Sequence, residues 1–334
     1  MVKRSVKLVY CGTPMFAVPS LQALVDAGHE LRLVVTQPDR PKGRGMELAP
    51  SPVKQKACEL GLAIAQPEKI KNNAEFRAQL EALGPDCIVV VGYGRIIPRW
   101  MLELPRHGNI NLHASLLPKY RGAAPIQWAV ASGETVTGNT TMRIDEGLDT
   151  GDILLQREMA IAAEDTSVTL APRLAAMGAE LLVQTLAALE AGQLQPRPQD
   201  NRHATLAPIL TREDGRIDFA RNAQTIYNRH RGFQPWPGSF TAFRGKQVAL
   251  HGISVVAGAP ALILNPPEEG RSGTPLPEGA VAVSGELLLA GCAGQTAIAI
   301  HELQLEGKRR MSAREFINGY QPKPGERLGE RLGS

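Results

Sequence analysis

The first half of the chain alternates short apolar runs with amphipathic stretches. Three runs have the length of a strand, and the last is nearly continuous, as expected of a strand buried on both faces: Val6–Tyr10, Leu31–Thr36 and Asp86–Val91. Between them, residues that favour helix starts and glycines that favour helix ends bracket three amphipathic segments: Pro19–Gly28, Ser51–Gly61 and Asn73–Gly84. This alternation predicts a parallel sheet covered by helices on both faces.

Two later segments lack this periodicity. Gln37–Pro50 is rich in proline, glycine and charge, which predicts a long exposed loop without strand or helix, and loops of this length are commonly functional. A long helix that ends near Gly192 is followed by the polar segment QLQPRPQDNRHAT, which is typical of a linker. Beyond it, short strands separated by glycine and proline predict a small β-barrel: Ser239–Val256, Gly279–Leu289 and Thr296–Leu305.

These patterns predict an α/β fold class with two domains, and a chain of 334 residues is long enough for both. We expect a Rossmann-like parallel-sheet domain over residues 1–190 and a linker over 191–206. A small OB-like β-barrel domain should follow over residues 207–318, with a tail over 319–334.

Composition agrees with a folded globular protein, because hydrophobic residues make up 43% and charged residues 21% of the chain. No apolar run is long enough to span a membrane, and the basic start leads into a strand-length run without a cleavage site, so we expect neither a membrane segment nor a signal peptide. The cysteines stand far apart and indicate reduced thiols of a cytoplasmic protein rather than a metal cage: Cys11, Cys58, Cys87 and Cys292. A net charge of +4 does not by itself indicate nucleic-acid binding.

Candidate chemistry begins in the segment Gly108–His113, where polar and apolar residues alternate strictly. The alternation places Asn111 and His113 on the same face of a strand. The ends of such strands are where open α/β sheets place their binding crevices. Taken alone, an Asn-x-His pair is more typical of strand-end hydrogen bonding than of catalysis.

Longer motifs change this interpretation. Asn111–Trp128 reads N-L-H-x-S-L-L-P-x-Y-R-G-x-x-P-x-x-W, and Asp145–Leu154 reads D-x-G-x-D-T-G-x-I-L. Both motifs resemble those of the formyltetrahydrofolate-dependent formyltransferases. The similarity covers nearly the whole chain, from C-G-T-P-x-F-A-V-P at Cys11 to G-K-R-R-M-S-A-R-E-F at Gly307.

The resemblance implies a catalytic set of Asn111, His113 and Asp149, with no metal. Attack of an amine on a formyl carbon creates an oxyanion and a surplus proton. The Asn111 amide can donate to the oxyanion, and loss of one such donor typically costs about 3 to 4 kcal/mol. His113 can accept the proton or hold the oxyanion as imidazolium, and both roles stay open, while Asp149 can orient it. For Asp145 and Asp152 we favour capping of the turn.

The resemblance also implies a site for 10-formyltetrahydrofolate, the formyl donor. Ser115, Leu116, Leu117 and Pro118 should line the folate pocket. Residues 89–94 should form the wall beside its pterin ring, with Val91, Tyr93 and Gly94 as contacts, although core packing is an equally good interpretation of the valines.

Within the family, members that formylate the amino group of methionyl-initiator tRNA are the most similar. Their inserted loop is matched by Arg40–Gly45, which implies tRNA contacts from Lys42, Gly43 and Arg44. Arg231–Gly238 resembles their barrel-entry motif, in which we expect Phe233 and Trp236 to pack the base of the barrel. The better candidates for phosphate contacts are the basic residues near the end of the barrel domain, although a solvated surface is an equally good interpretation of each one taken singly: Lys308, Arg309, Arg310 and Arg314.

The chain departs from the family at a few positions. Lysines are usual in the family at three positions where this chain has Met46, Glu47 and Ile209. These replacements remove positive charge, so the tRNA contacts that the resemblance implies near these residues are in doubt. Asn139 replaces a usual Val or Ile and bears only on local packing.

We expect a monomer that uses a folate and charged initiator tRNA and no membrane. The alternatives are a formyltransferase for nucleotide-sugar amines, a hydrolase of formyl-folate, and a tRNA-binding or folate-binding protein without catalysis. Sugar-nucleotide formyltransferases lack the Arg44 loop. A formyl-folate hydrolase could use the same three residues with water as the acceptor. A protein that only binds tRNA or folate would need neither a base nor an oxyanion donor.

Overall fold

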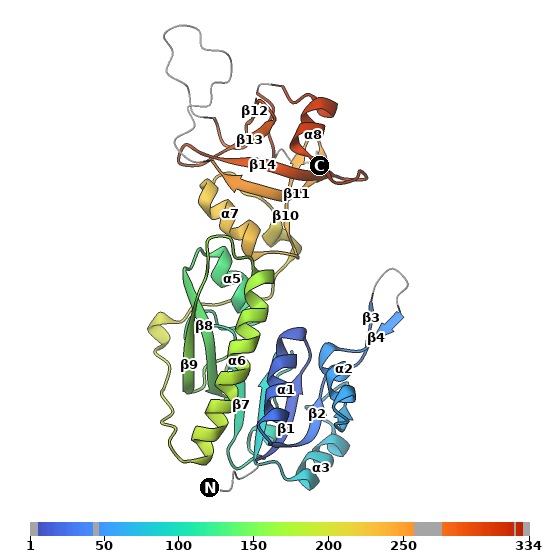
Figure 1. Ribbon diagram of the computed structural model, residues 1–334, viewed down its shortest axis with the longest axis vertical. Coiled ribbons are helices and arrows are strands. Elements are labelled where there is room, and N and C mark those ends of the chain that lie inside the picture. The colour runs from blue at the N-terminus through green and yellow to red at the C-terminus, as the bar shows by residue number, and fades with distance from the viewer. Residues whose placement is uncertain (1–5, 43–46, 257–275, 324, 330–334) are drawn as a thin grey trace. The chain divides into compact units, whose positions relative to one another are not determined.

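The computed structural model describes residues 6–42, 47–256, 276–323 and 325–329. The chain forms two compact units. The N-terminal unit comprises residues 1–126, 135–161 and 169–209, and the C-terminal unit comprises residues 127–134, 162–168 and 210–334. Figure 1 shows the helices and strands of both units.

The N-terminal unit is built on a seven-stranded sheet. Its strands follow the spatial order β5 (Ile64–Ala65), β2 (Glu30–Val35), β1 (Lys7–Gly12), β6 (Cys87–Val91), β7 (Asn109–His113), β8 (Val136–Arg143) and β9 (Ile153–Ala160). The strands from β5 to β7 are parallel, which confirms the predicted parallel core, whereas β8 and β9 run antiparallel to their neighbours.

Helices cover both faces of this sheet because alternate strand residues point to opposite sides. Leu8 and Tyr10 of β1 share a core with residues of α1, α2 and α6, and Val9 and Cys11 share one with residues of α3 and α4. The helices that precede residue 209 are η1 (Met15–Ala17), α1 (Val18–Asp26), α2 (Pro52–Glu59), α3 (Ala74–Leu83), α4 (Arg99–Leu102), α5 (Pro125–Ala131), α6 (Ser167–Glu190) and η2 (Asn201–His203).

The predicted helix caps are confirmed. The Ser51 side chain accepts from the Lys54 backbone N–H at 3.0 Å, and the Asn73 side chain accepts from that of Phe76 at 3.0 Å. Gly84 ends α3 in the left-handed conformation. These caps satisfy backbone groups that the helices leave unpaired, which is why the sequence marks their ends well.

The prediction for Gln37–Pro50 is wrong. Gln37–Pro50 was expected to be a loop without strands, but β3 (Arg40–Lys42) and β4 (Glu47–Ala49) form an antiparallel pair. Leu48 is 70% exposed, so this ribbon does not depend on a buried apolar face. Because the two strands pair through backbone hydrogen bonds and not through a buried face, their sequence has no alternation of apolar and polar residues that would predict them.

The C-terminal unit contains an antiparallel sheet, as its short strands predicted. The order is β10 (Ser239–Phe243), β11 (Lys246–Val255), β14 (Thr296–Leu305), β13 (Leu287–Cys292) and β12 (Val281–Ser284), and β15 (Met311–Ser312) pairs with β14. Its helices are η3 (Arg212–Gly215), α7 (Ala223–Gly232) and α8 (Ala313–Tyr320). Phe316 of α8 and Ile226 of α7 pack into the sheet's core.

Residues near the end of the chain join the two edges of this sheet. The Leu328 backbone N–H donates to the Gly279 carbonyl beside β12, and that of Gly329 donates to the Ala242 carbonyl of β10. Leu328 is also part of the buried core. The sequence placed these residues in a tail, and the structure instead pairs them with both edge strands.

Candidate active site

Three polar side chains meet at the end of β7 in the N-terminal unit. The Asn111 Nδ2 donates to the Asp149 Oδ1 over 3.4 Å, and the His113 Nδ1 lies 3.7 Å from the Asp149 Oδ2. The alternation of β7 turns Asn111 and His113 to one side of the sheet, and Asp149 reaches them from the loop between β8 and β9. The structure therefore brings together the three residues that the sequence singles out.

Backbone groups fix both the imidazole and the carboxylate. The His113 Nε2 donates to the Tyr120 carbonyl at 2.9 Å, and the Gly122 N–H donates to the Asp149 Oδ2 at 2.9 Å. A carbonyl oxygen can only accept, so Nε2 carries a hydrogen and Nδ1 faces the carboxylate. Any proton that the ring takes up must therefore enter at Nδ1.

The loop that carries Asp149 has a strained backbone conformation that hydrogen bonds stabilise. Asp149 adopts a φ of 52°, which is in the left-handed region and unfavourable for a residue with a side chain. Nearby, the Asp145 carboxylate accepts from the Gly147 N–H at 3.0 Å and from the Thr150 hydroxyl at 2.8 Å. Asp145 thus caps the turn, as predicted, and Asp149 is free to serve the site.

The predicted folate residues fall into two groups. Ser115 and Leu117 are buried, and the Val91 side chain belongs to the core, which agrees with the packing interpretation of the valines. Tyr93 is also buried, and burial raises the pKa of its hydroxyl. The more accessible members of the set are Leu116, Pro118 and Gly94.

A set of polar residues that the sequence did not single out lies beside Tyr93. The Tyr93 carbonyl accepts from the Gln37 Nε2 at 3.0 Å and from the Thr13 hydroxyl at 3.3 Å, and the Arg95 Nε donates to the Gln37 Oε1 at 3.1 Å. These residues follow β1, β2 and β6, whose carboxyl ends share one edge of the sheet. That shared edge is the signal that could have grouped them.

Glycine is required where the chain turns after β6. Gly92 has a φ of 55°, and a Cβ placed there would lie 2.9 Å from the Pro14 side chain. The turn therefore brings the loop after β6 against the loop after β1, next to the Tyr93 carbonyl.

The predicted tRNA contacts are only partly described. Gly43, Arg44 and Met46 lie outside the described residues, as does the side chain of Lys42. Lys308, Arg309 and Arg310 are exposed. Within this cluster Arg309 pairs with Glu315 at 2.6 Å and Arg310 pairs with Glu302, while the neighbouring Arg314 pairs with Glu286 at 2.9 Å. Exposed pairs of this kind contribute about 0 to 1 kcal/mol, so phosphate oxygens can replace the carboxylates.

The barrel-entry motif differs from expectation at one aromatic residue. Phe233 is buried, and its ring packs edge-to-face on Trp128 of α5, with ring centroids 5.2 Å apart. Trp236 was expected to pack the barrel base, but it is 55% exposed. The Gly238 N–H donates to the Phe233 carbonyl and closes a turn that contains the exposed Trp236.

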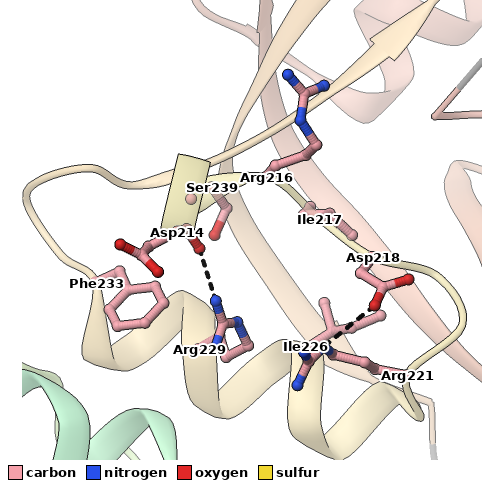
Figure 2. Close-up of a pocket in the computed structure, with 10 residues that line it drawn as sticks. Asp214, Arg216, Ile217, Asp218, Arg221, Ile226, Arg229, Phe233 and Ser239 are labelled. Atoms are coloured by element: carbon pink, nitrogen blue, oxygen red, sulfur yellow. Dashed lines mark hydrogen bonds and ion pairs between the residues drawn. The ribbon is translucent and has the colours of Figure 1, made fainter. Parts of the chain in front are cut away.

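A small cavity of about 10 Å³ lies beside α7 in the C-terminal unit (Figure 2). The Arg229 guanidinium lies 4.7 Å from the Phe233 ring and donates to the Asp214 carbonyl, while Arg221 pairs with Asp218. A volume of this size is close to that of a single water molecule, so we interpret it as a packing gap. The candidate chemistry remains at β7.

The buried cysteines do not contribute a nucleophile. Burial raises the pKa of the Cys11 thiol, and it raises that of Cys87 to about 12. Thiolates are the reactive form, so both residues are unreactive core side chains.

Comparison with known proteins identifies the family. Residues 3–186 match the family model described as formyl transferase, and residues 209–321 match the formyl transferase C-terminal domain. The chain is 62% identical to the methionyl-tRNA formyltransferase of Koribacter versatilis, over 98% of this chain and 99% of the relative. It is 60% identical to the protein of that name from Acidobacterium capsulatum, over 97% and 99%.

A solved structure supports the fold. The N-formyltransferase from Helicobacter canadensis, solved in complex with folinic acid and dTDP-3-aminofucose, superposes with a TM-score of 0.61 at 16% identity. The match covers 90% of this chain and 100% of that one. Among the described residues, no helix is both long enough and apolar enough to cross a membrane.

Proposed function

The chain belongs to the methionyl-tRNA formyltransferase family, and we propose that it transfers the formyl group of 10-formyltetrahydrofolate to the amino group of methionyl-initiator tRNA. The observation that carries this proposal is the convergence of Asn111, His113 and Asp149 in a chain that matches these relatives almost end to end. Because initiator tRNA is used in translation, which takes place in the cytoplasm, we propose that the protein is cytoplasmic.

The geometry supports distinct roles for the three side chains. The Asn111 amide supplies an uncharged donor for the oxyanion, once it turns from the Asp149 carboxylate toward the formyl oxygen. The His113 Nδ1 takes the proton of the attacking amine, or the ring holds the oxyanion as imidazolium, and in both cases the Asp149 carboxylate stabilises the charged ring. Holding both reactants together removes much of the remaining entropic barrier.

The surroundings fit the two substrates in different ways. Leu116 and Pro118 offer accessible apolar surface just after His113 for the folate ring. The acceptor end of the tRNA is assigned to the loop that includes Lys42, Gly43 and Arg44, and phosphates farther along the tRNA to the Lys308–Arg310 cluster.

An acceptor-choice assay tests this function. Purified protein is incubated with 10-formyltetrahydrofolate and, separately, with methionyl-initiator tRNA, a dTDP-amino sugar, or buffer alone. Formyl transfer to the tRNA is expected, and uncharged initiator tRNA is the matched control because it lacks the amine. Product found only on the sugar, or only as formate, contradicts the proposal.

A further inference from the structure

A segment between the two family domains contacts the candidate active site. Residues 199–207 lie after the first family match, which ends at residue 186, and before the second, which begins at residue 209. They nevertheless belong to the N-terminal unit. Their polar composition predicted a linker, yet their hydrogen bonds reach both loops that hold the catalytic side chains.

The first of these loops carries Asp149. The Gln199 Nε2 donates to the Asp149 carbonyl at 2.8 Å and to the Gly151 carbonyl at 2.8 Å. One amide therefore bridges the two carbonyls on either side of Thr150. The left-handed conformation of Asp149 is costly and persists only where its surroundings hold it. Gln199 is one of the groups that hold it.

The second loop runs through Tyr120, Arg121 and Gly122. The Arg121 side chain is 7% exposed, and its Nε and Nη2 donate to the Gln199 Oε1 at 3.0 and 2.7 Å. Its Nη2 also donates to the Asn201 Oδ1 at 2.8 Å. A guanidinium on the amide oxygen polarises Gln199 and strengthens its N–H donors.

This second loop also contacts the catalytic side chains directly. Tyr120 accepts the His113 Nε2 hydrogen, and Gly122 donates to the Asp149 carboxylate. The Thr205 hydroxyl in turn accepts from the Tyr120 N–H at 2.8 Å. Gln199 thus lies where the loop of the imidazole and the loop of the carboxylate are joined, and it contacts neither reacting group.

We propose that Gln199 is a positioning residue that acts through Asp149, by fixing the turn that presents the carboxylate to His113 and Asn111. The inference rests on the proposed function. It identifies the segment after α6 as part of the active-site framework rather than as a passive connection.

Two substitutions separate the contacts of Gln199. Gln199→Leu has a similar size and removes every hydrogen bond, whereas Gln199→Glu keeps an acceptor for Arg121 but loses both donors to the Asp149 loop. Both variants are expected to lower the single-turnover rate of formyl transfer to methionyl-initiator tRNA by about 10- to 100-fold, because small displacements of catalytic groups are costly. The KM for each substrate should stay within about twofold. Gln184→Leu is the control, since Gln184 also accepts from an arginine, Arg157, but on the exposed side of α6.

A double-mutant cycle with Asp149→Ala distinguishes positioning from general loss of structure. If Gln199 acts through Asp149, Gln199→Leu should cause little further loss of rate when the carboxylate is already absent. Equal losses in both backgrounds would overturn the inference, as would an unchanged rate in Gln199→Leu alone. The same cycle with Gln199→Glu decides the question if the leucine variant does not fold. Failure of the wild-type protein to formylate the tRNA would instead reject the proposed function.

Discussion

Both units of the molecule gather polar side chains for the proposed reaction, but they hold them differently. In the N-terminal unit His113 is 5% exposed, and the backbones of Tyr120 and Gly122 bond it and its carboxylate partner. In the C-terminal unit the arginines of the Lys308–Arg310 cluster are exposed, and each pairs with one glutamate. Chemistry needs groups fixed before the substrate arrives, whereas phosphate binding tolerates side chains that exchange partners. Substitutions in the two regions should therefore affect different kinetic constants.

The largest effect is expected from His113→Ala. Loss of the group that handles the proton should lower kcat by about 10²- to 10⁴-fold. Folate should still bind, because its contacts come from other residues, and isothermal titration with a formyl-folate analogue measures this. His107→Ala, just before β7, is the control and should keep near wild-type rates. Wild-type turnover in His113→Ala would remove His113 from the mechanism.

A backbone change near the site should have the next largest effect. Gly122 has a φ of 122°, and a Cβ there would lie 2.6 Å from the Ala207 carbonyl oxygen. Gly122→Ala should displace the N–H that holds Asp149 and lower kcat by about 100-fold. Gly28→Ala is the control, because Gly28 also has a positive φ of 82° but no atom near the added Cβ. Equal kcat values for the two variants would show that the rigidity of this loop does not matter.

Parts of this arrangement could be predicted from the sequence, and parts could not. Alternation along β7 places Asn111 and His113 on one face, since a strand has a fixed period of two. Helix caps such as Asn73 were equally readable, because their partners lie three residues away. Gln199 bonds residues about 50 positions earlier, and no local pattern records such a contact. The exposure of Trp236 likewise depends on how its turn is oriented, and the residues of the turn do not reveal that orientation.

Buried polar groups of the C-terminal unit should affect stability rather than turnover. Burial lowers the pKa of His230 from 6.5 to about 4. Between these values the unfolded chain binds a proton that the folded chain does not, so the free energy of unfolding should fall as pH decreases, by up to about 1.4 kcal/mol per pH unit. Urea unfolding from pH 7 to pH 4 measures the slope. His230→Gln should flatten it, and an identical slope would contradict the assignment.

The smallest effect is expected from the basic cluster. Replacing Lys308, Arg309 and Arg310 together by alanine should raise the KM for tRNA several-fold and weaken its dependence on salt, with kcat and the KM for folate unchanged. The control replaces three exposed, ion-paired arginines of the N-terminal unit: Arg77, Arg99 and Arg106. A fall in kcat without a change in the KM for tRNA would show that this cluster acts in catalysis. It would contradict the proposed division between a catalytic N-terminal unit and a phosphate-binding cluster in the C-terminal unit.

The most direct test of the central claim is a crystal structure of the enzyme with a stable formyl-folate analogue. We predict that the Asn111 Nδ2 turns from the Asp149 carboxylate to the formyl oxygen, at about 2.7 to 3.2 Å, with the His113 Nδ1 open toward the side from which the amine attacks. A formyl group bound out of hydrogen-bond reach of Asn111, with the imidazole facing away from it, would contradict the account.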